Sequence, residues 1–162
     1  MWGFVGLLDK SDLATHPYDE VGIPPLSDEF TPERFDQLLE EYPDKTKKGI
    51  KGFLVTSKHV HGIGNGYLQD ILFRAKIHPA HKIPKLSSHE RLKLHTAIQE
   101  TMAEAIKMGG RDDEHDLFDR SGGYTRLMSN QTVGKPCPDC GTSIEKISYL
   151  GGACYLCPNC QV

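Results

Sequence analysis

Four cysteines near the end of the chain constrain its fold more than any other feature. The stretches "CPDCG" and "CPNCQ" are two copies of one turn, and they place Cys137, Cys140, Cys157 and Cys160 in the spacing C-x2-C-x16-C-x2-C. This spacing is typical of zinc sites. Each turn points two thiolates inward, and two turns complete a tetrahedron of sulfurs around Zn²⁺. We therefore expect one structural zinc ion with no open position for catalysis.

The residues between the two turns predict a β-hairpin. β-branched and aromatic residues flank Gly151 and Gly152, as they do in hairpins. A module this small buries little apolar surface, so zinc binding, on the order of 10–16 kcal/mol in comparable peptides, is expected to stabilise it. The fifth cysteine, Cys154, lies outside both turns and faces away from Cys157 on a strand. We expect it to be a small buried side chain.

The cysteines also indicate the cellular compartment. Their number is odd and they cluster in the last 26 residues, which suits metal binding in a reducing compartment better than a disulfide framework. No window approaches the length of an apolar membrane span, and the first residues lack the pattern of a signal peptide. We expect a cytoplasmic protein.

Charge is distributed unevenly along the chain. The formal net charge is −3, but residues 1–44 hold 2 basic and 11 acidic side chains, whereas residues 45–85 hold 9 basic and 1 acidic. A basic block of this kind is either a solvated surface or the footprint of a polyanion such as nucleic acid. Because the block brackets a glycine-rich turn, we favour the polyanion.

The glycine-rich turn is "HGIGNGYLQD", which precedes an apolar run. Asn65 is a good N-cap for a helix over 66–75, and the amides around Gly64 and Gly66 would be free to bind an anion. Lys51 and Lys58 on the preceding segment would complete a phosphate clamp. A purely structural tight turn is the main alternative. A dinucleotide fingerprint is disfavoured because Tyr67 stands where its last glycine belongs.

Helical patterns fill most of the remaining sequence. Thr31 and Pro32 predict a helix start, with apolar residues at helical spacing over 32–42. A second helix is expected over 47–59. Ser87 and Glu90 form a capping-box pattern that opens a long helix, and Gly109–Gly110 ends it. The opening stretch "WGFVGLL" reads as a short strand.

Together, the turn and the cysteines resemble a known family. "FLVTSKHVHGIGNGYLQDILFRAKIHP" resembles the helix–two-turn–helix motif of the formamidopyrimidine-DNA glycosylase and endonuclease VIII family, and "GKPCPDCGTSIEKISYLGGACYLCPNCQ" is similar to its zinc finger. The resemblance implies a mainly α fold, a helix–two-turn–helix bundle followed by a C-terminal four-cysteine zinc β-hairpin. It also implies base-excision repair, in which a damaged base is flipped out of duplex DNA and excised. By analogy, Lys51, Gly64, Asn65 and Gly66 would hold the DNA backbone.

Two features depart from the family pattern. The family's nucleophile is an N-terminal proline amine followed by a glutamate, whereas this chain begins Met1-Trp2-Gly3. The family's finger usually carries an arginine at the hairpin tip, whereas Gly152 occupies that position here. Lys135 and Arg126 are candidates to replace it. We therefore expect DNA binding without base excision, and no catalytic residue in this chain.

The expected organisation has three parts. Residues 1–25 would be a strand and linker from an absent β-rich domain, 26–132 the DNA-binding domain, and 133–162 the zinc finger. The expected partner is damaged double-stranded DNA, bound by a monomer. The alternative is a protein-interaction module that keeps the fold without DNA contact. His59 and His61 flank the turn either as phosphate-binding cations or as packing residues, and "DDEHD" reads as a solvated acidic loop.

Overall fold

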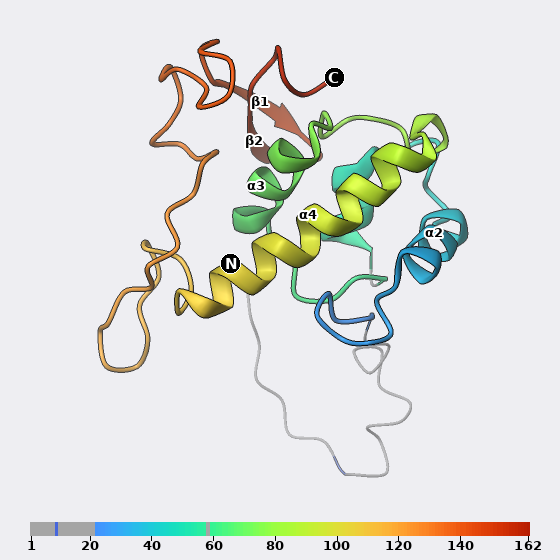
Figure 1. Cartoon of the computed structure of the whole chain (residues 1–162), viewed down its shortest axis with the longest axis horizontal. Coiled ribbons are helices and arrows are strands. Elements are labelled where there is room, and N and C mark those ends of the chain that lie inside the picture. The colour runs from blue at the N-terminus through green and yellow to red at the C-terminus, as the bar shows by residue number, and fades with distance from the viewer. Residues whose placement is uncertain (1–8, 10–21, 58) are drawn as a thin grey trace.

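The computed structural model describes residues 9, 22–57 and 59–162, so the expected opening strand and Lys58 lie outside the described residues. Within that part the chain is helix-rich, with three α-helices, α2 (Pro32–Glu41), α3 (Asn65–Ala75) and α4 (Ser88–Lys107). One antiparallel hairpin follows, formed by β1 (Glu145–Tyr149) and β2 (Gly152–Leu156). Figure 1 shows the long α4 crossing beside α3, with α2 and the hairpin at opposite sides of the helices. No described helix is long and apolar enough to cross a bilayer.

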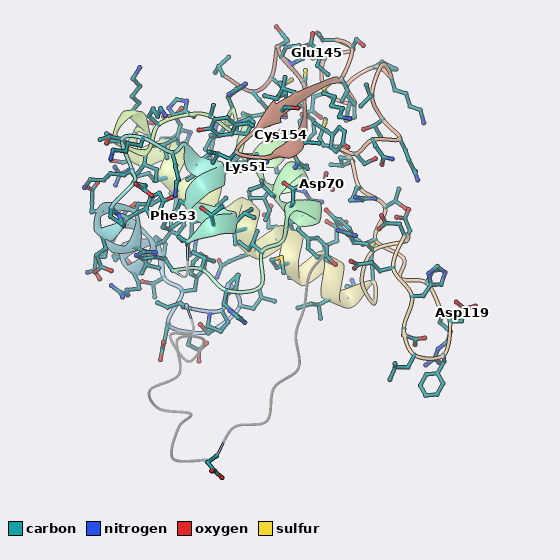
Figure 2. All side chains as sticks on the ribbon, turned by 180° about the vertical axis from the view of Figure 1, so that it is seen from behind. Lys51, Phe53, Asp70, Asp119, Glu145 and Cys154 are labelled. Atoms are coloured by element: carbon teal, nitrogen blue, oxygen red, sulfur yellow. The ribbon has the colours of Figure 1, made fainter. Side chains whose placement is uncertain are left out.

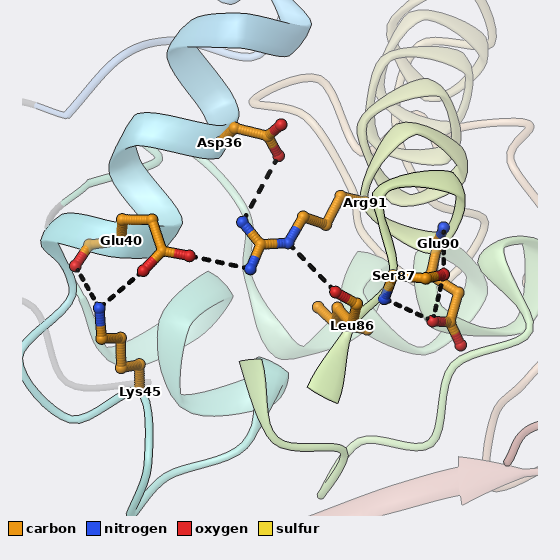
Figure 3. Close-up of polar contacts among 7 residues, drawn as sticks. All are labelled: Asp36, Glu40, Lys45, Leu86, Ser87, Glu90 and Arg91. Carbon is orange, nitrogen blue, oxygen red and sulfur yellow. Dashed lines mark hydrogen bonds and ion pairs between the residues drawn. The ribbon is translucent and has the colours of Figure 1, made fainter. Parts of the chain in front are cut away.

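The predicted starts of α2 and α4 are confirmed. The Thr31 hydroxyl accepts a hydrogen bond from the Arg34 amide at 3.2 Å, and Pro32 follows at the first helical position, where its missing N–H costs nothing. At α4, the Ser87 hydroxyl accepts from the Glu90 amide while the Glu90 carboxylate accepts from the Ser87 amide (Figure 3). These local contacts fix where each helix enters the bundle.

Replacing Ser87 with alanine tests the capping box. The Glu90 amide then loses its partner, and we expect the free energy of unfolding to fall by about 1 kcal/mol. Urea denaturation followed by circular dichroism measures this change. A Ser88→Ala variant, one residue further along, is the control. Equal effects from the two variants would contradict the capping assignment.

An arginine joins α2 to α4. Arg91 is 16% exposed, and its Nη2 lies 2.9 Å from Glu40 Oε1, while Nη1 lies 3.9 Å from Asp36 Oδ1 (Figure 3). Lys45 binds the same Glu40 carboxylate at 2.7 Å. These hydrogen bonds lower the pKa of Glu40, that of Lys45 most. The network aligns two helices that share one apolar core.

The segment between α2 and α3 differs from the prediction. We expected a helix over 47–59, but the structure has a shorter helical segment, in which Ile50 and Lys51 lead into η1 (Gly52–Thr56), a turn with π-type geometry. Gly49 precedes this segment and packs against the Ala80 backbone, where an added Cβ would fall 2.6 Å away. At the other end, Thr56 and Ser57 hydroxyls bond the Gly52 and Phe53 carbonyls. Such back-bonding competes with the helix ladder.

The apolar side chains form two clusters that meet at α3. The larger packs α2, η1, α3 and α4 together and includes Phe35, Phe53 and Ile98, each fully buried. The smaller lies under the hairpin, where Phe73 of α3 packs against Met128 and Ile144. Phe73 therefore anchors the hairpin module to the helical bundle.

Candidate nucleic-acid interface and metal centre

The start of α3 presents backbone amides to solvent. Gly62, at φ 80°, turns the chain, and Gly64 is the N-cap with extended geometry. The amides of Gly64, Asn65 and Gly66 donate to no acceptor among the described residues, whereas the Tyr67 and Leu68 amides donate to the Gly64 carbonyl. Gly64 and Asn65 are exposed. Open amides at the positive end of a helix favour an anion.

Asn65 does not cap the helix, as we had expected, but is its first residue. Its Nδ2 donates to the Ala153 carbonyl of β2 at 3.3 Å, and its Oδ1 accepts from Gln69 Nε2 at 3.1 Å. The side chain therefore faces the hairpin and leaves no capping bond at Gly64. The contact with the hairpin, which sequence patterns could not place here, explains why the N-cap is Gly64 and not Asn65.

Lys51 is placed differently from its predicted role. Its side chain is 3% exposed, and Nζ donates to the carbonyls of Tyr149 at 2.8 Å and Gly152 at 3.3 Å. Figure 2 shows it beside Cys154, whose sulfur lies 3.4 Å from Nζ. The ammonium thus joins the helical domain to the hairpin tip and is not available to a phosphate. Gly152 suits this approach, because an added Cβ would stand 3.2 Å from Nζ.

Gln69 is a structural residue that sequence reasoning missed. It is 3% exposed and bonds the hairpin through both ends of its amide: Nε2 donates to the Ala153 carbonyl at 3.3 Å, and Oε1 accepts from the Tyr155 amide at 3.1 Å. The only sequence signal is a polar residue on the apolar face of a helix. Gln69 fixes β2 beside the open start of α3.

Asp70 holds the next segment in place from the middle of α3 (Figure 2). It is fully buried and accepts hydrogen bonds from the Tyr124 hydroxyl and from the Leu127 and Met128 amides, at 2.8–3.0 Å. Burial raises the pKa of Asp70, and these three donors oppose the shift. Burial, with the nearby Asp70 charge, also raises the pKa of Tyr124. The contacts bring the chain from α4 back past the start of α3.

The four predicted cysteine ligands converge. The sulfurs of Cys137, Cys140, Cys157 and Cys160 all lie within 4.8 Å of one another, and no other such cluster of ligating side chains occurs in the described part of the chain. The Cys140–Cys157 and Cys137–Cys160 pairs are 3.4 and 3.9 Å apart. A zinc tetrahedron with bonds of 2.3 Å would have edges of roughly 3.8 Å. Cys154, as predicted, is buried away from this group.

The surroundings of the thiols shift their pKa values in opposite directions. Hydrogen bonding to Thr142 lowers the pKa of Cys140 to about 5. The pKa of Cys160 is raised to about 12, first by its hydrogen bond with Cys140 and then by burial and the other cysteines. Four sulfurs this close cannot all ionise without a cation between them. The donor set therefore fits one dication.

A hollow of about 470 Å³ opens at the start of α3. Its walls include the glycine turn, Tyr67, Gln69 and Tyr155, and two arginines from the segment after α4, Arg111 and Arg126. The neighbouring "DDEHD" stretch is exposed, as predicted, and within it Asp113 and Glu114 pair with these arginines. Tyr42 and Phe53 lie against the His59 ring, the arrangement of a packing residue.

A helical bundle with an open, amide-rich helix start beside a four-cysteine hairpin is the arrangement expected of helix–two-turn–helix proteins with a four-cysteine finger. The family model "Formamidopyrimidine-DNA glycosylase H2TH domain" matches residues 21–115, more than half of the chain. This chain therefore belongs to the formamidopyrimidine-DNA glycosylase family, which confirms the resemblance seen in the sequence.

Curated relatives match most of the chain. The formamidopyrimidine-DNA glycosylase of Lactobacillus helveticus is 35% identical over 160 residues, which cover 96% of this chain and 56% of the relative. That of Cytobacillus firmus is 38% identical over 152 residues, which cover 90% and 53%. The chain thus spans about half the length of the curated relatives it matches.

Solved structures of this family resemble the fold of the chain. The MutM (Fpg) protein of Thermus thermophilus superposes with a TM-score of 0.79 and 31% identity, covering 88% of this chain and 54% of that one. Lactococcus lactis Fpg in complex with DNA containing an abasic site gives a TM-score of 0.81 and 29% identity, covering 95% and 56%. The shared fold includes both the helices and the hairpin region.

Proposed function

We propose that this chain binds the backbone of double-stranded DNA as the DNA-binding portion of a base-excision repair glycosylase that acts on damaged bases. The observation that carries this proposal is the set of three amides, from Gly64 to Gly66, that find no partner among the described residues at an exposed helix start. A phosphate oxygen is the natural acceptor there. The L. lactis relative was solved with damaged DNA bound.

The cysteine cluster supports this role indirectly. We infer that it holds one structural Zn²⁺, because four thiolates fill a tetrahedral site and leave no position for a substrate. The hairpin that it organises supplies the Ala153 carbonyl and the Tyr155 amide, which fix Asn65 and Gln69. A metal ion held by the four cysteines would therefore fix the hairpin beside the proposed phosphate site. Lys58 remains a sequence-based candidate for a further backbone contact.

A salt titration tests the binding mode. The whole chain is mixed with a short undamaged duplex and with the same duplex carrying an abasic site, and affinity is followed by fluorescence anisotropy. Each phosphate that a lysine or arginine of the chain neutralises should contribute about 0.9 to the negative slope of log affinity against log salt. We expect a slope of roughly 3 for three or four contacts. Binding that does not change with salt would contradict backbone recognition.

An excision assay tests the proposed lack of catalysis. The abasic duplex, and a duplex carrying an oxidised purine, are incubated with the chain and with borohydride. We expect no strand cleavage and no trapped covalent complex, because the described residues hold no amine placed as a nucleophile beside the hollow. Turnover, or a trapped complex, would mean that the chain carries a nucleophile of its own.

One observation favours a protein-interaction module as the second candidate. In the segment after α4, Leu117 is fully exposed and Phe118 is 75% exposed, with acidic residues on both sides. Figure 2 shows Asp119 of this loop extending away from the body of the molecule. An exposed apolar pair suits a protein surface better than a phosphate backbone. Absence of duplex binding at any salt concentration would favour this alternative.

A further inference from the structure

Two arginines occupy an electrostatically unfavourable place at the start of α3. The Arg111 guanidinium lies so close to the helix that a Cβ on Gly66 would fall 1.5 Å from Nη1. The start of a helix carries partial positive charge. A cation at this position is therefore destabilising unless a nearby anion interacts with both the cation and the helix start. Arg111 is only 18% exposed, and water therefore offers it limited screening.

Two carboxylates of the same segment supply that anion. Asp113 Oδ1 lies 2.9 Å from Arg111 Nε, and Glu114 Oε1 lies 2.9 Å from Arg111 Nη2. The second oxygen of Asp113 lies 2.5 Å from Nη2 of Arg126, which is 13% exposed. The two arginines and two carboxylates cancel in formal charge. The open amides of α3 then leave the hollow with a positive excess.

The pairing is incomplete on the arginine side. Arg126 Nε is buried and finds no hydrogen-bond partner in the described residues. Arg111 Nη1, which faces Gly66, also donates to no described acceptor. A single phosphodiester placed in the hollow offers two free oxygens and could accept from the amides and from a guanidinium together. The carboxylates satisfy only part of this donor set.

We propose that Arg111 and Arg126 are further phosphate-binding residues, and that Asp113 and Glu114 compete with the DNA backbone for them. The inference rests on the proposed DNA binding and extends it. In the free protein the carboxylates hold the two guanidinium groups beside the α3 amides. When duplex arrives, a backbone phosphate replaces carboxylate contacts, and the acidic residues turn to solvent. The two carboxylates therefore lower the affinity of the chain for any polyanion, so that only a phosphate that fits the hollow displaces them.

Neutral, nearly isosteric variants test the competition. Asp113→Asn and Glu114→Gln, in the full chain, should each raise affinity for a short undamaged duplex by about three- to tenfold at fixed salt. Asp119→Asn is the matched control, because it removes the same charge from the same loop, and no arginine contact of Asp119 is found in the described residues. We expect the control to change affinity by less than about twofold.

The arginines are tested in the opposite direction. Arg111→Gln and Arg126→Gln should each weaken binding and reduce the salt slope by about 0.9, the value for one phosphate contact. Arg120→Gln, whose guanidinium is 72% exposed beside Asp116, is the control. Hydrogen exchange of the α3 amides reports whether each variant keeps its fold.

The outcomes separate the two proposals. If Asp113→Asn and Asp119→Asn have equal effects while the chain still binds duplex with a salt-dependent slope, the carboxylates act only through net charge and the competition is wrong. If the salt slope is unchanged in both Arg111→Gln and Arg126→Gln, neither arginine binds phosphate and the proposal is likewise wrong. If the unaltered chain binds no duplex, the proposed function itself fails.

Discussion

Removal of the metal should unfold the hairpin while leaving the helices intact. Among the described residues, the apolar cluster under the hairpin has only five buried members, two of them cysteines of the proposed metal site, whereas the larger cluster holds twenty. Metal binding of comparable modules contributes on the order of 10 kcal/mol, far more than this small cluster can replace. After chelation, we expect hydrogen exchange at β1 and β2 to lose all protection, while helical circular dichroism falls only slightly.

Matched cysteine variants sharpen this test. Cys157→Ser removes a proposed ligand and should lower zinc affinity by several orders of magnitude, with the loss of hairpin protection seen on chelation. Cys154→Ala removes the buried fifth cysteine, and we expect one zinc per chain to be retained, as measured by elemental analysis. Full hairpin protection in the metal-free chain would contradict a metal-dependent module.

Replacing Lys51 with methionine should cost about 3 kcal/mol in the free energy of unfolding. Methionine keeps the apolar stem but removes the ammonium, which leaves the Tyr149 and Gly152 carbonyls without this donor. Unsatisfied buried polar groups cost about 1–3 kcal/mol each. Urea denaturation measures the loss, and we expect hydrogen exchange to increase most at the hairpin tip.

The Lys51 variant also decides whether this lysine stabilises the hairpin or binds a DNA phosphate. Lys47→Met is the control, since that lysine is exposed and no side-chain partner for it is found in the described residues. If Lys51→Met leaves stability unchanged yet lowers the salt slope of duplex binding by about 0.9, Lys51 contacts phosphate directly. The structural assignment would then be wrong, and the role predicted from the sequence would be correct.

Features set by neighbouring residues could be predicted from the sequence. The Thr31 and Ser87 caps and the cysteine spacing act within a few positions, so their pattern determines their structure. The hairpin itself is another example, although its two-residue turn is Leu150–Gly151, one residue earlier than the predicted Gly151–Gly152, and Gly152 begins β2. Family membership followed from the order of these local signals.

Contacts between distant segments could not be predicted in this way. Lys51 and Tyr149 are 98 positions apart, and nothing near Lys51 indicates that its ammonium is enclosed by a hairpin. The same holds for Asn65, whose partner on β2 lies 88 positions away. Arg111 stands next to an acidic run that suggested a solvated loop. Only the fold shows that this arginine lies against Gly66.

A comparison of two Asn65 variants tests the central claim most directly. Proline is well tolerated at the first position of a helix, and the extended geometry of Gly64 accommodates it, so Asn65→Pro removes the backbone N–H together with the side chain. Asn65→Ala removes the same side chain but keeps the amide. If the open amides of α3 bind phosphate, Asn65→Pro should bind duplex about tenfold more weakly than Asn65→Ala, with equal helical content. Equal affinity of the two variants would contradict the account.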